Sequence, residues 1–224
     1  MGFYLLPWSR KQSSVSTLSA DLREVWSGHT FAELNPLRER LIEHFGLTTS
    51  PLAPAWRRYS GRFWEELSVW ALPGRVREEI ERRGILFSPL FGLLSAGDPV
   101  PRYSLRWEDG CGGVSLRSLW KLALRPVLCD LFDSTVLYDF LSSRDHRLLF
   151  VPQNTLRVSF LFYKGDRRVL NDLPHRAYTL RFLVERSLDI HSLDRINFLD
   201  YSVSEVRERG RELVVVLRGG GAYL

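Results

Sequence analysis

The segment Phe87–Leu105, FSPLFGLLSAGDPVPRYSL, gathers residue types that bind anions, at spacings that a strand and a capped helix would align. A short apolar strand is expected at its start. Ser88 followed by Pro89 is typical of a helix N-cap and the first helical position, so a helical turn is predicted over 90–94. A polar break at 95–98 follows. Because a capped helix start presents free N–H groups, the segment predicts either the floor of an anion site or an ordinary surface crossover.

The next stretch, 100–107, is expected to be extended and carries Arg102, Tyr103 and Arg106. Side chains two residues apart on a strand lie on the same face, so both arginines share a face with Ser104. Arginine recognises phosphate through planar, paired donors. The two arginines are therefore candidate anion contacts.

A second region of interest is the predicted helix His175–Arg186. Its apolar stripe is flanked by Arg176 and Arg181, which lie about 140° apart at about 100° per residue. Half-buried guanidinium groups need partners, either a carboxylate such as Glu185 or Asp98, or a phosphate. The sequence leaves both alternatives open.

The pattern around Ser88 resembles the central motif of the YaaA family of peroxide-stress proteins. The positions that carry the resemblance are Ser88, Phe91-Gly92-Leu93-Leu94, Asp98 and Tyr103-Ser104-Leu105. The family has an arginine at the position of Ser104, which Arg102 or Arg106 would replace. Other segments resemble the family in order and spacing over about the whole chain: 3–11, 59–64, 135–142, the helix with Arg176, Arg181 and Glu185, 193–201 and 212–217.

This resemblance implies a cytoplasmic oxidative-stress protein that binds DNA without catalysis and helps to limit peroxide- and iron-driven DNA damage. It implies a basic cleft whose nucleic-acid- or anion-binding residues are Lys11, Tyr59, Gly61, Ser88, Phe91, Gly92, Asp98, Arg102, Tyr103, Arg106, Ser142, Arg176 and Arg181. DNA, single- or double-stranded, is the expected partner. No catalytic residue, metal or cofactor is expected.

Two other functions compete with DNA binding. The same cleft could serve an enzyme that acts on a nucleotide or another phosphorylated small molecule, with Asp98 as acid or base and with Ser88 and Arg181 placing the anion. The basic face could also be incidental to a protein-interaction domain. The five histidines lack metal-ligand spacing, and Cys111 and Cys129 are isolated, so neither nucleophile nor zinc site is predicted.

The composition favours an anionic partner, because the chain of 224 residues has a net charge of +5 and a pI near 9.5. Most of the excess lies in Val151–Arg186, which holds seven Arg or Lys against three Asp or Glu. All but three of the 31 basic residues are arginine, a bias that also suits a GC-rich genome or a thermophile. No apolar run approaches the roughly 20 residues of a membrane span.

The hydrophobic pattern predicts an α/β fold with a single mixed β-sheet and helices on both faces, in one domain, 1–224, with a small helical lobe over 17–83. Strands are predicted at 3–7, 84–87, 135–141, 156–163 (central in the sheet) and 212–217. Helices are predicted at 19–27, 31–45, 61–70, 74–83, 115–132 (broken at Pro126) and 175–186, with a connector at 47–56. The turn 71–76 could grip a DNA phosphate as a helix-hairpin-helix loop, and Lys164, Arg167 and Arg168 form a basic hairpin tip.

Overall fold

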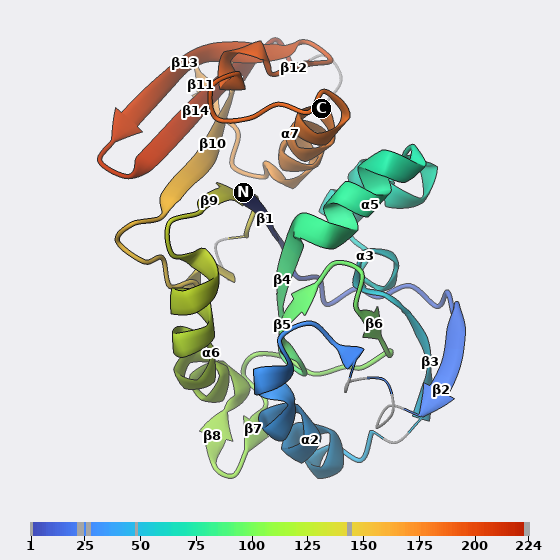
Figure 1. The fold of residues 1–224 in the computed structure, drawn as a ribbon. Coiled ribbons are helices and arrows are strands. Elements are labelled where there is room, and N and C mark those ends of the chain that lie inside the picture. The colour runs from blue at the N-terminus through green and yellow to red at the C-terminus, as the bar shows by residue number, and fades with distance from the viewer. Residues whose placement is uncertain (1, 22–24, 26–27, 48, 143–144, 222–224) are drawn as a thin grey trace.

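A computed structural model describes residues 2–21, 25, 28–47, 49–142 and 145–221. Its centre is a mixed sheet of nine strands with helices packed against it, so the predicted α/β fold is confirmed (Figure 1). In spatial order the strands are β12 (Asn197–Phe198), β13 (Tyr201–Arg209), β14 (Glu212–Gly219), β10 (Leu156–Lys164), β9 (Val136–Asp139), β1 (Gly2–Leu6), β4 (Gly84–Ser88) and β5 (Gly92–Ser95), and β11 (Arg167–Arg168) pairs with β10.

Five neighbouring strands of this sheet, from β14 to β4, run parallel, so their carboxyl ends lie along one edge, here called the carboxyl edge. The chain leaves β1 toward β4 on one side and returns to β9 on the other side of β1. Parallel sheets bind ligands at such a switch in strand order, outside the carboxyl ends of the strands. The topology therefore directs attention to the loops after β1, β4, β9 and β10.

Helices cover both faces of the sheet. They are α2 (Asn35–His44), α3 (Ala55–Arg58), α4 (Arg62–Leu67), α5 (Gly74–Arg83), α6 (Leu116–Phe132) and α7 (Leu173–Glu185), with 3-10 turns at Ala32–Leu34, Val69–Ala71, Asp145–Arg147 and Leu193–Arg195. Tyr4 packs under Arg83 of α5, whereas its neighbour Phe3 packs on Phe132 of α6. Because adjacent strand residues point to opposite faces, α5 and α6 lie on opposite sides. Helix α7 packs against α4 and α5.

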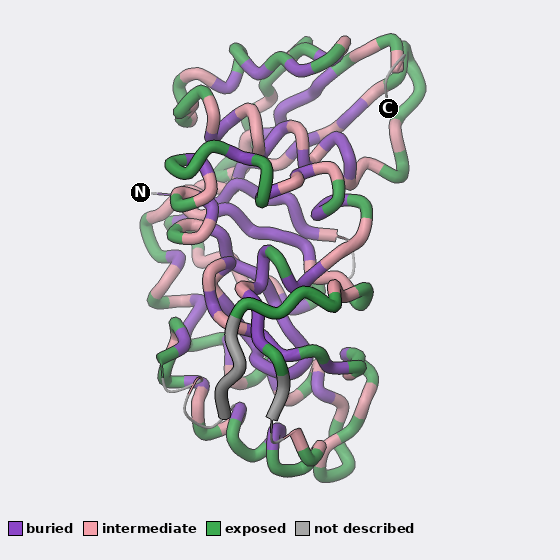
Figure 2. Tube along the Cα trace, turned by 90° about the vertical axis from the view of Figure 1, so that its right-hand side faces the viewer, coloured by how far each residue is buried: buried purple, intermediate pink, exposed green. Residues whose placement is uncertain are grey.

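The long buried strand β10 is interior to the sheet, as its two-sided apolar pattern predicted. Helix α6 continues through Pro126 without the expected break. Figure 2 shows the buried residues concentrated along the sheet, with exposed residues at the loops and the outer helix faces.

Residues 17–83 contain strands as well as helices. β2 (Leu18–Asp21) pairs with β3 (Thr49–Pro54), and β3 pairs with β6 (Pro99–Val100); β7 (Gly110–Cys111) and β8 (Val114–Ser115) form a separate hairpin. Of the helix expected over 19–27, residues 19–21 form a strand instead and Val25 is helical, while 22–24 and 26–27 lie outside the described residues. Within the connector expected at 47–56, Thr49–Pro54 forms the strand β3, because β2 pairs with one of its edges and β6 with the other.

The helical turn predicted over 90–94 is also wrong. Strand β4 turns directly into the antiparallel strand β5, with Ser88 opposite Gly92. The Ser88 hydroxyl accepts a hydrogen bond from the Phe91 N–H at 3.1 Å, so it closes a tight turn instead of capping a helix. Gly92 has φ of 74°, and a Cβ there would lie 2.4 Å from the Trp120 ring. The turn therefore needs glycine for both conformation and space.

Candidate functional site

At the end of β4, three buried side chains form a hydroxyl cluster, Ser88, Tyr59 and Tyr103, and the half-buried Trp8 lies beside it. The Tyr103 hydroxyl lies 2.7 Å from that of Tyr59 and 2.9 Å from Ser88 Oγ, and accepts a hydrogen bond from Trp8 Nε1 at 3.2 Å. Burial raises the pKa of both tyrosines. The cluster is therefore neutral and closed, and its groups satisfy one another.

Trp8 connects this cluster to the loop after β9. Its backbone N–H donates to Asp145 Oδ2 at 3.3 Å, and the same oxygen accepts from the Ser142 hydroxyl at 2.8 Å. The other oxygen, Oδ1, has no hydrogen-bond partner within the described residues. Burial raises the pKa of Asp145 to about 6, although these hydrogen bonds oppose the change. Near neutral pH the network carries a poorly satisfied buried carboxylate.

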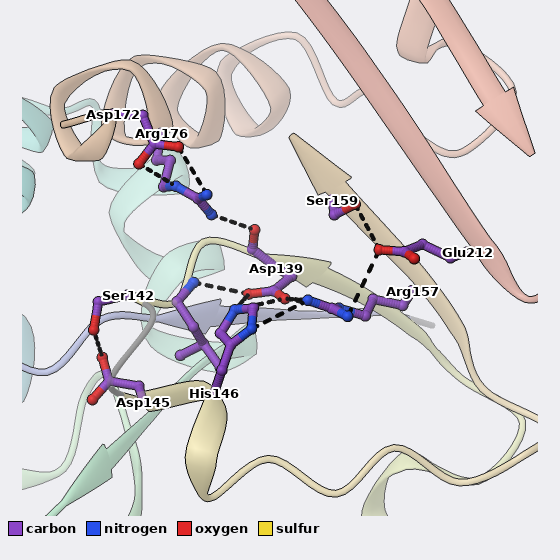
Figure 3. A network of polar contacts seen from close by, with 10 residues as sticks. Asp139, Ser142, Asp145, His146, Arg157, Ser159, Asp172, Arg176 and Glu212 are labelled. Carbon is purple, nitrogen blue, oxygen red and sulfur yellow. Dashed lines mark hydrogen bonds and ion pairs between the residues drawn. The ribbon is translucent and has the colours of Figure 1, made fainter. Parts of the chain in front are cut away.

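Asp139, six residues earlier at the end of β9, has a pKa shifted in the opposite direction, because its carboxylate has charged partners (Figure 3). Arg157 Nε donates to its Oδ2 at 2.8 Å, and His146 Nε2 lies 3.1 Å from the same oxygen. Burial alone would raise the pKa of Asp139, but the hydrogen bond and charge of His146 and the charge of Arg157 outweigh burial and hold the pKa below its usual value. Arg157 is also 3.7 Å from Glu212. Asp139 is therefore an ionised carboxylate with partners inside the protein.

A different kind of site lies at the end of β10, in a hollow of about 520 Å³, here called the hairpin hollow. Its cationic side chains are Arg62 from α4 and Lys164, Arg167 and Arg168 from the β10–β11 hairpin. Glu66 is the one carboxylate among its described lining residues. Two buried side chains, His175 and Tyr201, also line the hollow.

The cations of the hairpin hollow are largely free of carboxylate partners. Within the described residues, Arg62, Arg167 and Arg168 take part in no ion pair, and Lys164 donates only to the Gly221 carbonyl, at 2.9 Å. All four residues are exposed. A hollow rimmed by unpaired guanidinium groups is suited to phosphate.

The model of the peroxide stress protein YaaA family matches residues 12–207 of this chain. The chain belongs to this family. It is also similar to UPF0246 proteins of two Corynebacterium glutamicum strains, ATCC 13032 and R, each 26% identical over 185 residues, which cover 76% of this chain and 71% of the relative. No helix among the described residues is both long and apolar enough to cross a membrane.

Within this YaaA-family chain, the motif residues nearest Ser88 come together. Phe91 packs its ring 6.4 Å from Tyr103 and Gly92 follows it in the turn, so both belong to the wall of the hydroxyl cluster. Ser142 joins through Asp145 and Trp8. The structure thus gathers these residues at the carboxyl edge, where they serve a closed network.

Asp98 is separated from this network. Its carboxylate accepts hydrogen bonds from the Ser95 N–H at 2.9 Å and from the Thr30 N–H and hydroxyl at 3.2 and 3.0 Å. It therefore shapes the turn after β5 and pins the segment before α2. Neither Arg176 nor Arg181 is its ion-pair partner.

The two arginines of α7 have carboxylate partners on their own helix or beside it. Arg176 forms a two-point ion pair with Asp172 at 2.9 Å and donates to the Asp139 carbonyl at 3.3 Å (Figure 3). Arg181 pairs with Glu185 at 2.8 Å. The sequence left open whether these arginines pair with a carboxylate or bind a phosphate, and in the structure both pair with carboxylates.

The remaining predicted residues, Lys11, Gly61, Arg102 and Arg106, lie outside the hydroxyl cluster. Lys11 pairs with Glu65 at 2.7 Å, and a Cβ at Gly61 would be 3.0 Å from Ser9 Oγ, so the loop after β1 lies against the start of α4. Arg102 and Arg106 are exposed, as is Ser104 between them, while Tyr103 points inward.

Sequence reasoning missed two fully buried arginines, Arg38 and Arg58. Arg38 donates to the carbonyls of Phe91 and Leu93 at 3.0 and 2.7 Å and thereby clamps the β4–β5 turn. Arg58 likewise donates from Nε to the Val100 carbonyl, at 3.0 Å. Arg38 follows Leu34 and Leu37 in an apolar stripe, but the Phe91 and Leu93 carbonyls that it binds lie more than 50 residues away, and no spacing in the sequence reveals them.

Proposed function

We propose that this YaaA-family peroxide-stress protein binds DNA through its phosphate backbone, without catalysis, and thereby helps to limit peroxide- and iron-driven DNA damage. The observation that carries the proposal is the hairpin hollow, where four cationic side chains face one carboxylate. Such binding implies a cytoplasmic protein, and we propose that location.

The charges that support DNA binding differ from those first expected. Arg176, Arg181 and Lys11 each hold a carboxylate, so a phosphate would have to displace an existing ion pair. Arg62, Arg167 and Arg168 have no such partner within the described residues and can meet phosphate directly. We therefore propose the hairpin hollow as the main phosphate contact.

An enzyme acting on a nucleotide is the second candidate, and one observation favours it. His146 and Asp139 form a close pair at the switch in strand order, and the His146 side chain is 36% exposed. An imidazole held by a carboxylate is a common general base. Asp98, the acid or base first considered, is occupied by Ser95 and Thr30 and does not support this candidate.

The test is fluorescence anisotropy with labelled duplex and single-stranded DNA at about 50 and about 200 mM salt. If three to four phosphates are contacted, affinity for duplex should fall by about 100-fold between the two salts, because bound cations release counterions. Arg167→Ala/Arg168→Ala should weaken binding by about tenfold or more at low salt. Arg176→Ala/Arg181→Ala should weaken it less.

The matched control is Arg40→Ala/Lys121→Ala, which removes the same charge from the exposed faces of α2 and α6. Its affinity should stay within about threefold of wild type if position matters more than net charge. Equal losses in the control and the hairpin variant would reject the hairpin hollow as the contact. Absence of salt-sensitive binding in wild type would reject DNA binding altogether.

The arginine-rich composition also supports a thermophilic source, which we propose as a secondary point. Calorimetry should then give a melting temperature above the roughly 45–65 °C of mesophilic domains.

A further inference from the structure

Two buried polar side chains at the base of the hairpin hollow have no hydrogen-bond partner within the described residues. His175 is 3% exposed and Tyr201 is 1% exposed, and both ring nitrogens of His175 and the Tyr201 hydroxyl are unpaired. A buried polar group without a partner costs about 1–3 kcal/mol. Both side chains line the hollow, so a ligand inside it could supply the missing partners.

These two groups are held in fixed positions before any ligand arrives. The His175 ring lies 4.7 Å from the Tyr201 ring, edge to face, and 5.2 Å from the Phe162 ring. Pro174 places His175 in the first turn of α7. A rigid pair of this kind loses little conformational freedom on binding.

The hollow joins this polar base to a cationic rim and an apolar wall. Lys164, Arg167 and Arg168 provide positive charge at the rim, while Val169 and Pro174 provide apolar surface. Its volume of about 520 Å³ falls within the roughly 300–1,000 Å³ of small-molecule sites. A ligand with a concentrated negative charge at one end and a ring at the other fits this arrangement.

We propose that the hairpin hollow binds the phosphomonoester of a nucleotide, either at the 5′ end of a DNA strand or on a free nucleoside monophosphate. A terminal phosphate carries about 1.5 to 2 negative charges and three acceptor oxygens, whereas an internal phosphodiester carries one charge. An internal phosphate is also flanked by chain on both sides, so a terminal phosphate is the better match for an enclosed site. In its DNA-end form this inference rests on the proposed function.

The experiment compares two labelled single-stranded oligonucleotides of one sequence, one with a 5′-phosphate and one with a 5′-hydroxyl. Wild type should bind the phosphorylated strand about tenfold more tightly. Arg167→Ala/Arg168→Ala should remove this preference, while Arg40→Ala/Lys121→Ala should keep it. Unlabelled dAMP, added as a competitor, distinguishes a strand end from a free nucleotide.

Tyr201→Phe is the sharpest variant because it removes only the unpaired hydroxyl. It should lower the preference for the 5′-phosphate about threefold to tenfold, as expected for one lost hydrogen bond to a charged group. Unfolding by urea should show equal or higher stability, because the hydroxyl has no partner within the described residues to lose. A purely structural role for Tyr201 would lower stability in the variant and leave the preference intact, which would contradict the proposal.

The outcomes separate the two proposals. Equal binding of both strands would overturn the phosphomonoester site while leaving DNA binding in place. Saturable dAMP binding that depends on Arg167 and Arg168, without binding of either strand, would support the site and reject DNA binding. Binding of neither dAMP nor DNA would overturn both.

Discussion

The hydroxyl cluster and the hairpin hollow lie at the same edge of the sheet and use polar side chains in opposite ways. In the cluster at the end of β4, Tyr103 is buried and its hydroxyl contacts three neighbouring side chains. In the hollow at the end of β10, Tyr201 is also buried, and its hydroxyl has no hydrogen-bond partner among the described residues. Groups that satisfy one another stabilise a fold, whereas buried polar groups without a partner in the described part of the chain, beside cations without a carboxylate partner there, are the basis of the proposed ligand site.

The arginines also divide into those with hydrogen-bond partners inside the protein and those exposed at the surface. Arg38 is fully buried and donates to backbone carbonyls and to the Asn35 side chain, while Arg168 is exposed on the hairpin. The strong arginine bias of the chain therefore combines two uses. A count of basic residues overstates the charge that is available to a polyanion.

The largest expected loss of stability comes from removing Arg38, which holds the β4–β5 turn. Arg38→Ala should lower the free energy of unfolding by about 4 kcal/mol, because it leaves the Phe91 and Leu93 carbonyls buried without their donor. Arg40→Ala, two residues along the same helix but exposed, should stay within about 0.5 kcal/mol of wild type. Urea denaturation of both variants measures the difference, and similar values would remove the distinction between structural and free arginines.

A somewhat smaller loss is expected from Gly92→Ala, at about 3 kcal/mol. The added Cβ meets the Trp120 ring and the residue must keep a positive φ. Gly113→Ala is the matched control, because its φ is 79° but nothing lies within 4 Å of the new Cβ. It should cost only about 1 kcal/mol in the same denaturation assay. Equal costs would show that the fit against Trp120 is unimportant.

The pH dependence of stability tests the closed network. Unfolded Asp145 releases its proton near the ordinary pKa of 3.8 and folded Asp145 near 6, so the folded state binds more protons between these values. Its contribution to stability therefore falls as pH rises through this window, by at most about 3 kcal/mol. Asp145→Asn should remove the fall.

Urea denaturation at about pH 4 and about pH 7 measures this effect, and the variant should gain on wild type between them. The stability contributed by Asp139 changes with pH in the opposite direction. Its pKa is held low in the folded state, so this stability is present above the ordinary pKa of 3.8 and is lost as the pH falls below it. A parallel pH dependence of Asp145→Asn and wild type would contradict the buried carboxyl described for Asp145.

The smallest effect compares two tyrosines directly. Tyr103→Phe should cost about 2 kcal/mol, since Ser88, Tyr59 and Trp8 each lose a partner. Tyr201→Phe should cost no stability and should raise it by up to about 1–3 kcal/mol, because it removes a buried hydroxyl that has no partner within the described residues. If both variants lose the same stability, the hairpin hollow is as closed as the cluster.

Local patterns predicted much of the fold. The helical spacing of Phe31–Phe45, the two-sided apolar run of β10 and proline at the start of α7 all correspond to the observed elements. The errors fall where a partner distant in sequence decides. Residues 90–94 form half of a hairpin because Arg38 and Trp120 surround the turn, and β3 is a strand because β2 and β6 pair with it.

The sequence by itself determined the α/β class, the family motif, the excess positive charge and its concentration in 151–186, because these depend on residue type and short-range order. Only the tertiary structure decided which charges are free. Ion pairs such as Arg176–Asp172, and the lack of a hydrogen-bond partner for His175 and Tyr201 within the described residues, depend on how α7 meets the β10–β11 hairpin and β13. Whether a guanidinium is satisfied is a property of distances between elements, and no spacing along the chain encodes it.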